Sequence, residues 1–200
     1  MPDDEGAALY RAGCRAARSG GGPLVEVGTY CGRSALFLGS AAAAAGATLF
    51  SVDHHRGSEE NQPGWEHHDP SLVDPASGTF DTLPWARRNL AAASLEGVVV
   101  LVVGRSVTVA RAWSTPLALL FIDGGHGREE AWADYRAWAP KVAPGGLLAI
   151  HDVFPEPAAG GRPPYEIFCE AIRRGGFVDL AGAGCGSLRV LRRANPGCLG

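Results

Sequence analysis

The chain is poor in several features that would point to common classes of protein. Of its 18 basic residues only Lys141 is a lysine, and the formal net charge is -3 with a pI near 6.1. Such a balance favours neither nucleic acid nor an anionic membrane as a partner. No apolar run reaches membrane-spanning length, and residues 1–6 are acidic where a secretory signal would be basic. We therefore expect a cytoplasmic protein that binds neither nucleic acid nor membrane.

Signatures of a disulfide framework, of a structural zinc site and of a phosphate-binding turn are also missing. The cysteines are odd in number, scattered and without C-x-x-C spacing: Cys14, Cys31, Cys169, Cys185 and Cys198. This pattern favours neither a disulfide framework nor a structural zinc site. The chain's first glycine-rich turn lacks both the close G-x-G pair of dinucleotide-binding turns and the Lys-Ser/Thr ending of nucleotide-triphosphate loops. A phosphate cradle is therefore disfavoured there.

Helix-like and strand-like segments alternate along the chain. With 200 residues and 46% hydrophobic content, the sequence supports a single domain over residues 1–200. Helices are predicted at about 5–19, 33–44, 80–93, 106–113, 128–139 and 164–174, and strands at 24–28, 48–52, 98–103, 117–122, 146–151, 176–181 and 187–192. Alternation of this kind indicates an α/β fold, a parallel sheet covered by helices on both faces. The last two strands predict an antiparallel hairpin at one edge.

The stretch Leu24–Ser34 (LVEVGTYCGRS) is typical of a strand, a turn and the start of a helix. Gly28 and Gly32 suit a backbone that bends sharply or approaches a ligand closely, and Ser34 lies where a hydroxyl could cap the helix. Asp53 ends the next apolar run, where a carboxylate can accept both hydroxyls of a ribose. A nucleoside without a bound phosphate fits best, and a tight turn without a ligand is the alternative.

Polar side chains end the fourth and fifth predicted strands. Asp123 and His126 follow one, and His151 and Asp152 follow the other. Because the carboxyl ends of neighbouring parallel strands face one crevice, these four side chains should converge. Carboxylate-rich clusters suit Mg²⁺ better than zinc or copper, and a divalent ion would lower the pKa of an acceptor hydroxyl while His126 takes its proton. The alternative is that the four residues bind water or cap helices.

The segment 54–79 is long for a connection without regular structure and rich in aromatic and titratable groups. We predict a lid or acceptor-recognition loop, the alternative being a surface excursion that packs on itself or on a second subunit. The adjacent pairs His54-His55 and His67-His68 do not have zinc-ligand spacing. Trp65 could stack on an acceptor or anchor the loop to the core.

The motif Glu26-Val-Gly-Thr-Tyr-Cys-Gly, with Asp53, resembles class I S-adenosylmethionine (SAM)-dependent methyltransferases from about Leu24 to Arg193. The resemblance implies SAM as cofactor and a Rossmann-like, seven-stranded, mostly parallel sheet with a C-terminal antiparallel hairpin. It places the glycine turn beneath the methionine part of SAM, has Glu26 order that turn and Asp53 bind the ribose, and puts residues 104–106 at the adenine. The cofactor-binding residues are then Glu26, Gly28, Thr29, Tyr30, Gly32, Ser34, Asp53, His54, Gly104, Arg105, Ser106 and Asp123.

The second pair of strand ends resembles metal-dependent sugar O-methyltransferases of macrolide tailoring, the related cephalosporin-tailoring enzymes and the methylmannose polysaccharide O-methyltransferases. That resemblance implies a metal, most simply Mg²⁺, held by Asp123, His151 and Asp152. It also implies that His126 is the general base and that Asp123 serves catalysis. The chain departs from these families at His151, where they have Glu.

The sequence therefore predicts a SAM-dependent, metal-assisted O-methyltransferase acting on a hydroxyl of a sugar or glycoside, a mannoside being one option. The acceptor would be a small molecule or oligosaccharide. One alternative is methylation of a catechol or phenol in secondary metabolism, and another is a non-catalytic cofactor-binding protein. A homodimer is expected because apolar positions in Ala7–Ala17 exceed what a small domain need cover.

Overall fold

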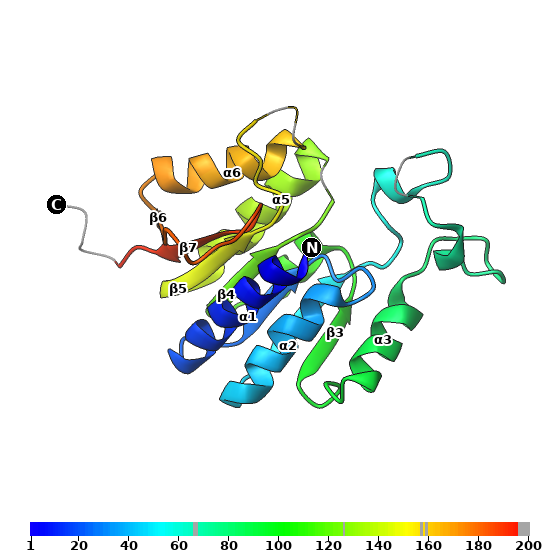
Figure 1. The fold of residues 1–200 in the computed structure, drawn as a ribbon, viewed down its shortest axis with the longest axis horizontal. Helices are drawn as coiled ribbons and strands as arrows, with labels where there is room; N and C mark the ends of the chain where they lie inside the picture. Colours follow the sequence, from blue (N-terminus) through cyan, green and yellow to red (C-terminus); the bar gives the residue numbers. More distant parts are fainter. Residues whose placement is uncertain (66–67, 126, 157, 159, 196–200) are drawn as a thin grey trace.

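A seven-stranded sheet forms the centre of the protein, seen in a computed structural model that describes residues 1–65, 68–125, 127–156, 158 and 160–195 (Figure 1). The strand order is β3-β2-β1-β4-β5-β7-β6. The strands are β1 (Leu24–Val27), β2 (Leu49–Asp53), β3 (Val99–Val103), β4 (Leu117–Ile122), β5 (Val142–Ile150), β6 (Phe177–Asp179) and β7 (Arg189–Arg193). The first five are mutually parallel, whereas β7 is antiparallel to both β5 and β6. The predicted mostly parallel sheet with an edge hairpin is confirmed.

Helices cover both faces of the sheet, as predicted. They are α1 (Asp3–Arg18), α2 (Arg33–Ala45), α3 (Leu83–Ala92), α4 (Ser106–Ala112), α5 (Arg128–Trp138) and α6 (Arg162–Arg173), with short 3₁₀ turns at Glu59–Asn61, Pro70–Leu72 and Ala139–Lys141. Buried side chains of α1, α2 and α3 form one core with one face of the sheet, and those of α4, α5 and α6 form a second core on the other face. Alternate residues of β4 divide between them: Leu119 and Phe121 enter the first core, Leu120 and Ile122 the second.

Two element boundaries differ from the sequence prediction. The strand expected from 146 begins at Val142, because the Pro-Gly-Gly segment that resembles a turn lies within β5, where the pairing with β4 shifts register and Gly145 has φ +78°. The helix expected from 80 begins at Leu83, whose N–H donates to Asp81 Oδ1. Phe80 instead forms an isolated bridge with Val73. The two boundaries are therefore set by a glycine-containing register shift and by a side-chain hydrogen bond, which the hydrophobic pattern does not indicate.

Helix α1 buries its apolar face within the chain. Ala8, Leu9, Ala12 and Ala16 all belong to the first core, and Tyr10 is the one large hydrophobic side chain of this helix that is exposed. The apolar positions on which the dimer prediction depended are thus covered intramolecularly. Self-association remains a prediction without support from this helix.

Segment 54–79, cyan to teal in Figure 1, stands away from the sheet beside α3 and leaves from the end of β2. It is not wholly irregular, since it contains two of the 3₁₀ turns and the Val73–Phe80 bridge. Leu72 within the segment and Phe80 directly after it are buried, and the Phe80 ring contacts that of Tyr30, whereas Trp65 is 54% exposed and belongs to neither core. Of the two roles considered for Trp65, anchoring the loop to the core is therefore wrong.

Candidate active site at the carboxyl edge of the sheet

The two glycine-containing turns that follow β1 and β4 touch each other. Gly28 has φ +97°, and a Cβ there would lie well inside contact distance of the Asp123 carbonyl oxygen. The Asp123 N–H donates to the Val27 carbonyl (2.9 Å), which holds the second turn against the first. Only glycine satisfies both the left-handed backbone and this close approach. The structure thus joins the predicted cofactor turn to the predicted metal-binding turn.

Asp53 fastens the first turn to β2. Its Oδ2 accepts hydrogen bonds from the backbone N–H groups of Thr29 and Tyr30 (both 2.9 Å), and its Oδ1 accepts one from the N–H of His55 (2.8 Å). Tyr30 and His55 have positive φ values of 49° and 60°. Strained non-glycine backbone of this kind persists where surrounding contacts enforce it, often at functional sites. Asp53 therefore helps to order the turn, in addition to Glu26, to which the resemblance assigned that role.

Glu26 lies on β1 with no exposed surface. Its Oε1 accepts a hydrogen bond from the Ser51 hydroxyl, and that hydroxyl also contacts the Thr29 hydroxyl. No partner of Oε2 is found within the described part of the chain. Burial raises the pKa of the Glu26 carboxyl to about 8, although Ser51 and Ser34 oppose the shift. Near neutral pH the carboxyl is mostly protonated, which suits a group buried beneath the turn.

The pKa of Glu26 predicts a pH dependence of stability. A carboxyl with a pKa of about 8 in the folded state and about 4.5 when unfolded stabilises fully below pH 4.5, and this stabilisation is lost as pH rises through 8. In thermal melts from pH 5 to 9 the parent chain should lose up to about 1.4 kcal/mol of unfolding free energy per pH unit through this group. Glu26→Gln should not show this loss. Exposed Glu96→Gln is the matched control. Parallel pH dependences of the parent chain and Glu26→Gln would contradict the assignment.

Ser34 does not cap helix α2, contrary to the sequence prediction. The helix begins at Arg33 after an N-cap at Gly32 (φ +90°), and no side-chain cap is formed. Ser34 therefore lies inside the helix. Its buried hydroxyl does not cap the helix but lowers the pKa of the Glu26 carboxyl, against the effect of burial. The prediction failed because the left-handed Gly32 takes the N-cap position, two residues before Ser34.

The residues predicted at the adenine lie at the end of β3. The N–H of Gly104 donates to the Asp53 carbonyl (3.0 Å), and Arg105 is the exposed N-cap residue of α4. Ser106 donates to Asp134 Oδ1 (2.6 Å) and accepts from Trp138 Nε1 (2.8 Å). The Ser106 hydroxyl thus joins α4 to α5, which the sequence did not predict.

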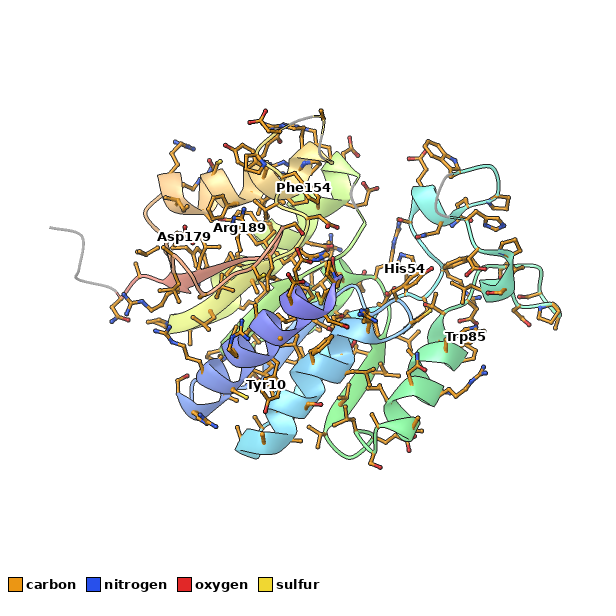
Figure 2. All side chains as sticks on the ribbon, viewed as in Figure 1. Tyr10, His54, Trp85, Phe154, Asp179 and Arg189 are labelled. Atoms are coloured by element: carbon orange, nitrogen blue, oxygen red, sulfur yellow. The ribbon has the colours of Figure 1, made fainter. Side chains whose placement is uncertain are left out.

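His54 and His55 differ despite their adjacency. His54 is exposed near the start of segment 54–79 (Figure 2), and its Nδ1 accepts from the N–H of Arg56 (3.0 Å). His55 is buried, with Nδ1 2.8 Å from the Thr82 hydroxyl. His55 therefore secures the loop to the start of α3, whereas His54 faces the solvent at the carboxyl edge. The segment also encloses a pocket of about 450 Å³ lined in part by Arg56, Gln62 and His68.

Asp123, His151 and Asp152 converge as the sequence predicted. Nδ1 of His151 lies 2.9 Å from Asp123 Oδ1 and 3.2 Å from Asp152 Oδ1. One ligand atom from each residue lies within 4.8 Å of the others, and this is the one such group among the described residues. Asp152 has φ +55°, a further strained position at this edge. His126, the predicted base, lies outside the described residues.

Two further residues of this site were not predicted from the sequence. Glu5 on α1 is 3% exposed, and its Oε2 lies 2.7 Å from His151 Nε2. Its Oε1 accepts hydrogen bonds from the N–H and the hydroxyl (2.9 Å) of Ser187. The signal in the sequence was an acidic residue one turn before Leu9, on the apolar face of the first helix. Its partner His151 lies 146 residues away in the sequence, and no local sequence pattern indicates a contact over that separation.

The charges around His151 are arranged to hold an imidazolium. Burial lowers the pKa of His151, but the close carboxylates of Asp123 and Asp152 outweigh burial and raise it to about 10. Burial also raises the pKa of Glu5, yet the Ser187 hydrogen bonds and His151 outweigh it and lower that pKa overall. Glu5 is therefore an ionised acceptor, and it has His151 Nε2–H as its donor.

The same three side chains fit a divalent cation. Two carboxylates and one imidazole make a donor set common for such ions, and Nδ1 of His151 is buried without a well-directed hydrogen bond. The short Nδ1–Asp123 contact is therefore an ion pair rather than an aligned hydrogen bond. Binding through Nδ1 requires that this nitrogen give up its proton.

Comparisons with known proteins agree with this geometry. The family model described as a methyltransferase domain matches residues 25–153. The structure is similar to the O-methyltransferase NovP (TM-score 0.68, 18% identity, 94% of this chain and 79% of that one) and to the calicheamicin methyltransferase CalS11 (0.65, 18%, 92% and 76%). It is also similar to the O-methyltransferase TomG from Streptomyces achromogenes, solved with SAM (0.65, 15%, 98% and 82%). The chain belongs to the methyltransferase family, with the class I, Rossmann-like fold of SAM-dependent enzymes.

The helices in the described ranges include none that is both long and apolar enough to cross a membrane.

Proposed function

We propose that the protein is a metal-assisted, SAM-dependent O-methyltransferase that acts on a hydroxyl of a sugar or glycoside. The observation that carries the proposal is the contact between the Gly28 turn and Asp123, because a cofactor bound at the one and an acceptor bound at the other would meet at adjacent strand ends. Methyl transfer needs the acceptor oxygen in line with the sulfonium methyl at short range. Two rigid turns packed against each other supply such positioning.

On the cofactor side, the first turn and the end of β2 would bind SAM. The left-handed glycines of this turn, Gly28 and Gly32, leave its backbone uncovered by Cβ atoms. The exposed side chains of Tyr30 and His54 lie beside the turn. Two hydrogen bonds to the Asp53 carboxylate come from the turn and one comes from His55, so that any bond from Asp53 to the ribose adds to an already ordered group. Residues 104–106 are assigned to the adenine on sequence grounds.

On the acceptor side, Asp123, His151 and Asp152 would hold a divalent cation. A cation bound there lowers the pKa of an acceptor hydroxyl and fixes its direction. We assign His126, three residues after Asp123, to receive the hydroxyl proton. Exposed Trp65 and the pocket beside Arg56 on segment 54–79 offer aromatic and polar groups to a saccharide.

A labelled-methyl assay distinguishes the proposal from its rivals. We expect transfer from labelled SAM to sugars or glycosides, mannosides included, and slower transfer to catechols and phenols, since the exposed loop surface is polar as well as aromatic. Faster transfer to phenols would replace the sugar by an aromatic acceptor. SAM binding in calorimetry with no transfer to either hydroxyl class would instead support a non-catalytic cofactor-binding protein.

A further inference from the structure

The Nε2 nitrogen of His151 contacts the buried carboxylate of Glu5. Glu5 Oε2 lies 2.7 Å from Nε2, while the N–H and hydroxyl of Ser187 both donate to Glu5 Oε1. Both donors and the carboxylate are buried, and a Cβ on Gly186 would collide with Oε1. Oε1 already accepts from both Ser187 donors, and Nε2 is the group that faces Oε2, so a proton on Nε2 completes the hydrogen bonds of this buried carboxylate. Glu5 thus turns the other nitrogen, Nδ1, towards Asp123 and Asp152.

The separations at Nδ1 match those between neighbouring ligands of one metal ion. With metal–ligand bonds of about 2.1 Å, ligand atoms at right angles lie about 3.0 Å apart. Nδ1 lies 2.9 Å from Asp123 Oδ1 and 3.2 Å from Asp152 Oδ1. A buried nitrogen at these distances, without an aligned hydrogen bond, is placed as a ligand would be.

A nitrogen ligand changes which ion such a site prefers. Carboxylate oxygens suit Mg²⁺, whereas imidazole suits first-row transition ions, whose affinities rise along the series from Mn²⁺ to Cu²⁺. We propose that Glu5 is a positioning residue that holds His151 in its Nε2–H tautomer, so that Nδ1, Asp123 and Asp152 bind a divalent transition ion such as Mn²⁺ or Co²⁺ in preference to Mg²⁺. The inference deepens the proposed function and rests on it for the role of the ion, but it concerns binding alone.

The chain offers a sharp variant, Glu5→Gln. The two donors of Ser187 would keep the amide oxygen at the Oε1 position, which places the amide NH₂ opposite His151 Nε2. An NH₂ donor there requires a lone pair on Nε2 and so moves the proton to Nδ1, where it blocks a ligand. Loss of such an outer carboxylate typically weakens metal binding about 10- to 100-fold. Asp4→Asn removes the same charge from the same helical turn without contact to His151, and is the matched control.

The test measures metal binding to the full chain, stripped of metal by chelation, without SAM or acceptor. By calorimetry with Co²⁺, Mn²⁺ and Mg²⁺ we expect the transition ions to bind more tightly. We expect His151→Glu to lower the Co²⁺-to-Mg²⁺ affinity ratio at least about tenfold. Glu5→Gln should weaken Co²⁺ binding about 10- to 100-fold while Asp4→Asn does not. Pulsed electron paramagnetic resonance of bound Mn²⁺ should show coupling to nitrogen in the parent chain and none in His151→Glu.

Three results would overturn the inference: an unchanged affinity ratio in His151→Glu, no nitrogen coupling in the parent, or equal Co²⁺ binding by Glu5→Gln and Asp4→Asn. If Glu5→Gln fails to fold by circular dichroism, the parent and His151→Glu measurements still decide. Failure of the proposed function is separate, because transition-ion binding through nitrogen without methyl transfer would leave this inference standing. Methyl transfer by a chain that binds no transition ion would remove the inference and leave hydroxyl methylation intact.

Discussion

Replacing Asp123 by asparagine should lower turnover at least about a hundredfold at saturating SAM and acceptor. The change keeps the shape of the side chain but removes the charge that faces Nδ1 of His151 at 2.9 Å and one of the three cation ligands that we assign. Because the Asp123 carbonyl rather than its carboxylate touches the Gly28 turn, the fold should persist. Steady-state kinetics with labelled SAM, together with a thermal melt, measures both.

The matched control for this substitution is Asp179→Asn. Asp179 lies on the edge strand β6, on the opposite side of the molecule from His54 in Figure 2, and is exposed. Its replacement should leave kcat unchanged. A kcat for Asp123→Asn within a few-fold of the parent, in a folded protein, would show that the Asp123 carboxylate is not required for catalysis.

Replacing His126 by alanine should lower kcat by about a hundredfold to ten-thousandfold, which is the usual range for loss of a general base. The expectation rests on its place in the sequence, three residues after Asp123 and four after the last residue of β4. Added imidazole should restore part of the turnover of His126→Ala, because a small base can enter the space that the side chain leaves. The assay is kcat against imidazole concentration at fixed pH.

The parent chain under the same imidazole series is the control for His126→Ala, and its turnover should not rise. Near-normal kcat in His126→Ala, with the same pH profile as the parent, would refute the base assignment. A lowered kcat that imidazole leaves untouched would point to a positional role for the ring instead.

The order of helices and strands could be predicted because it depends on local pattern. Buried strands such as β4 are continuous apolar runs, and in a parallel sheet each is separated from the next by a helix. Convergence of Asp123 with His151 and Asp152 followed from topology, since neighbouring parallel strands end at one edge. The boundaries at β5 and α3 could not be predicted, because a register shift and side-chain capping decide them.

The supporting residues of the site were missed for a related reason. Glu5 reaches His151 from the other end of the chain, and Ser187 holds Glu5 from the approach to β7. Asp53 was expected at a ribose, which stays a prediction, and the sequence did not indicate that its carboxylate also accepts from the N–H groups of Thr29 and Tyr30. Sequence spacing indicates which side chains share a sheet edge, but not which buried polar group satisfies which other.

The measurement that tests the central claim most directly is methyl transfer by metal-stripped protein. After exhaustive chelation, the chain should transfer no labelled methyl group from SAM to a glycoside that it otherwise methylates, and a divalent cation should restore transfer. Cation-dependent transfer to a saccharide hydroxyl is the result that the account predicts. Full transfer after chelation, with no increase when a cation is returned, would contradict the assignment of Asp123, His151 and Asp152 to a cation.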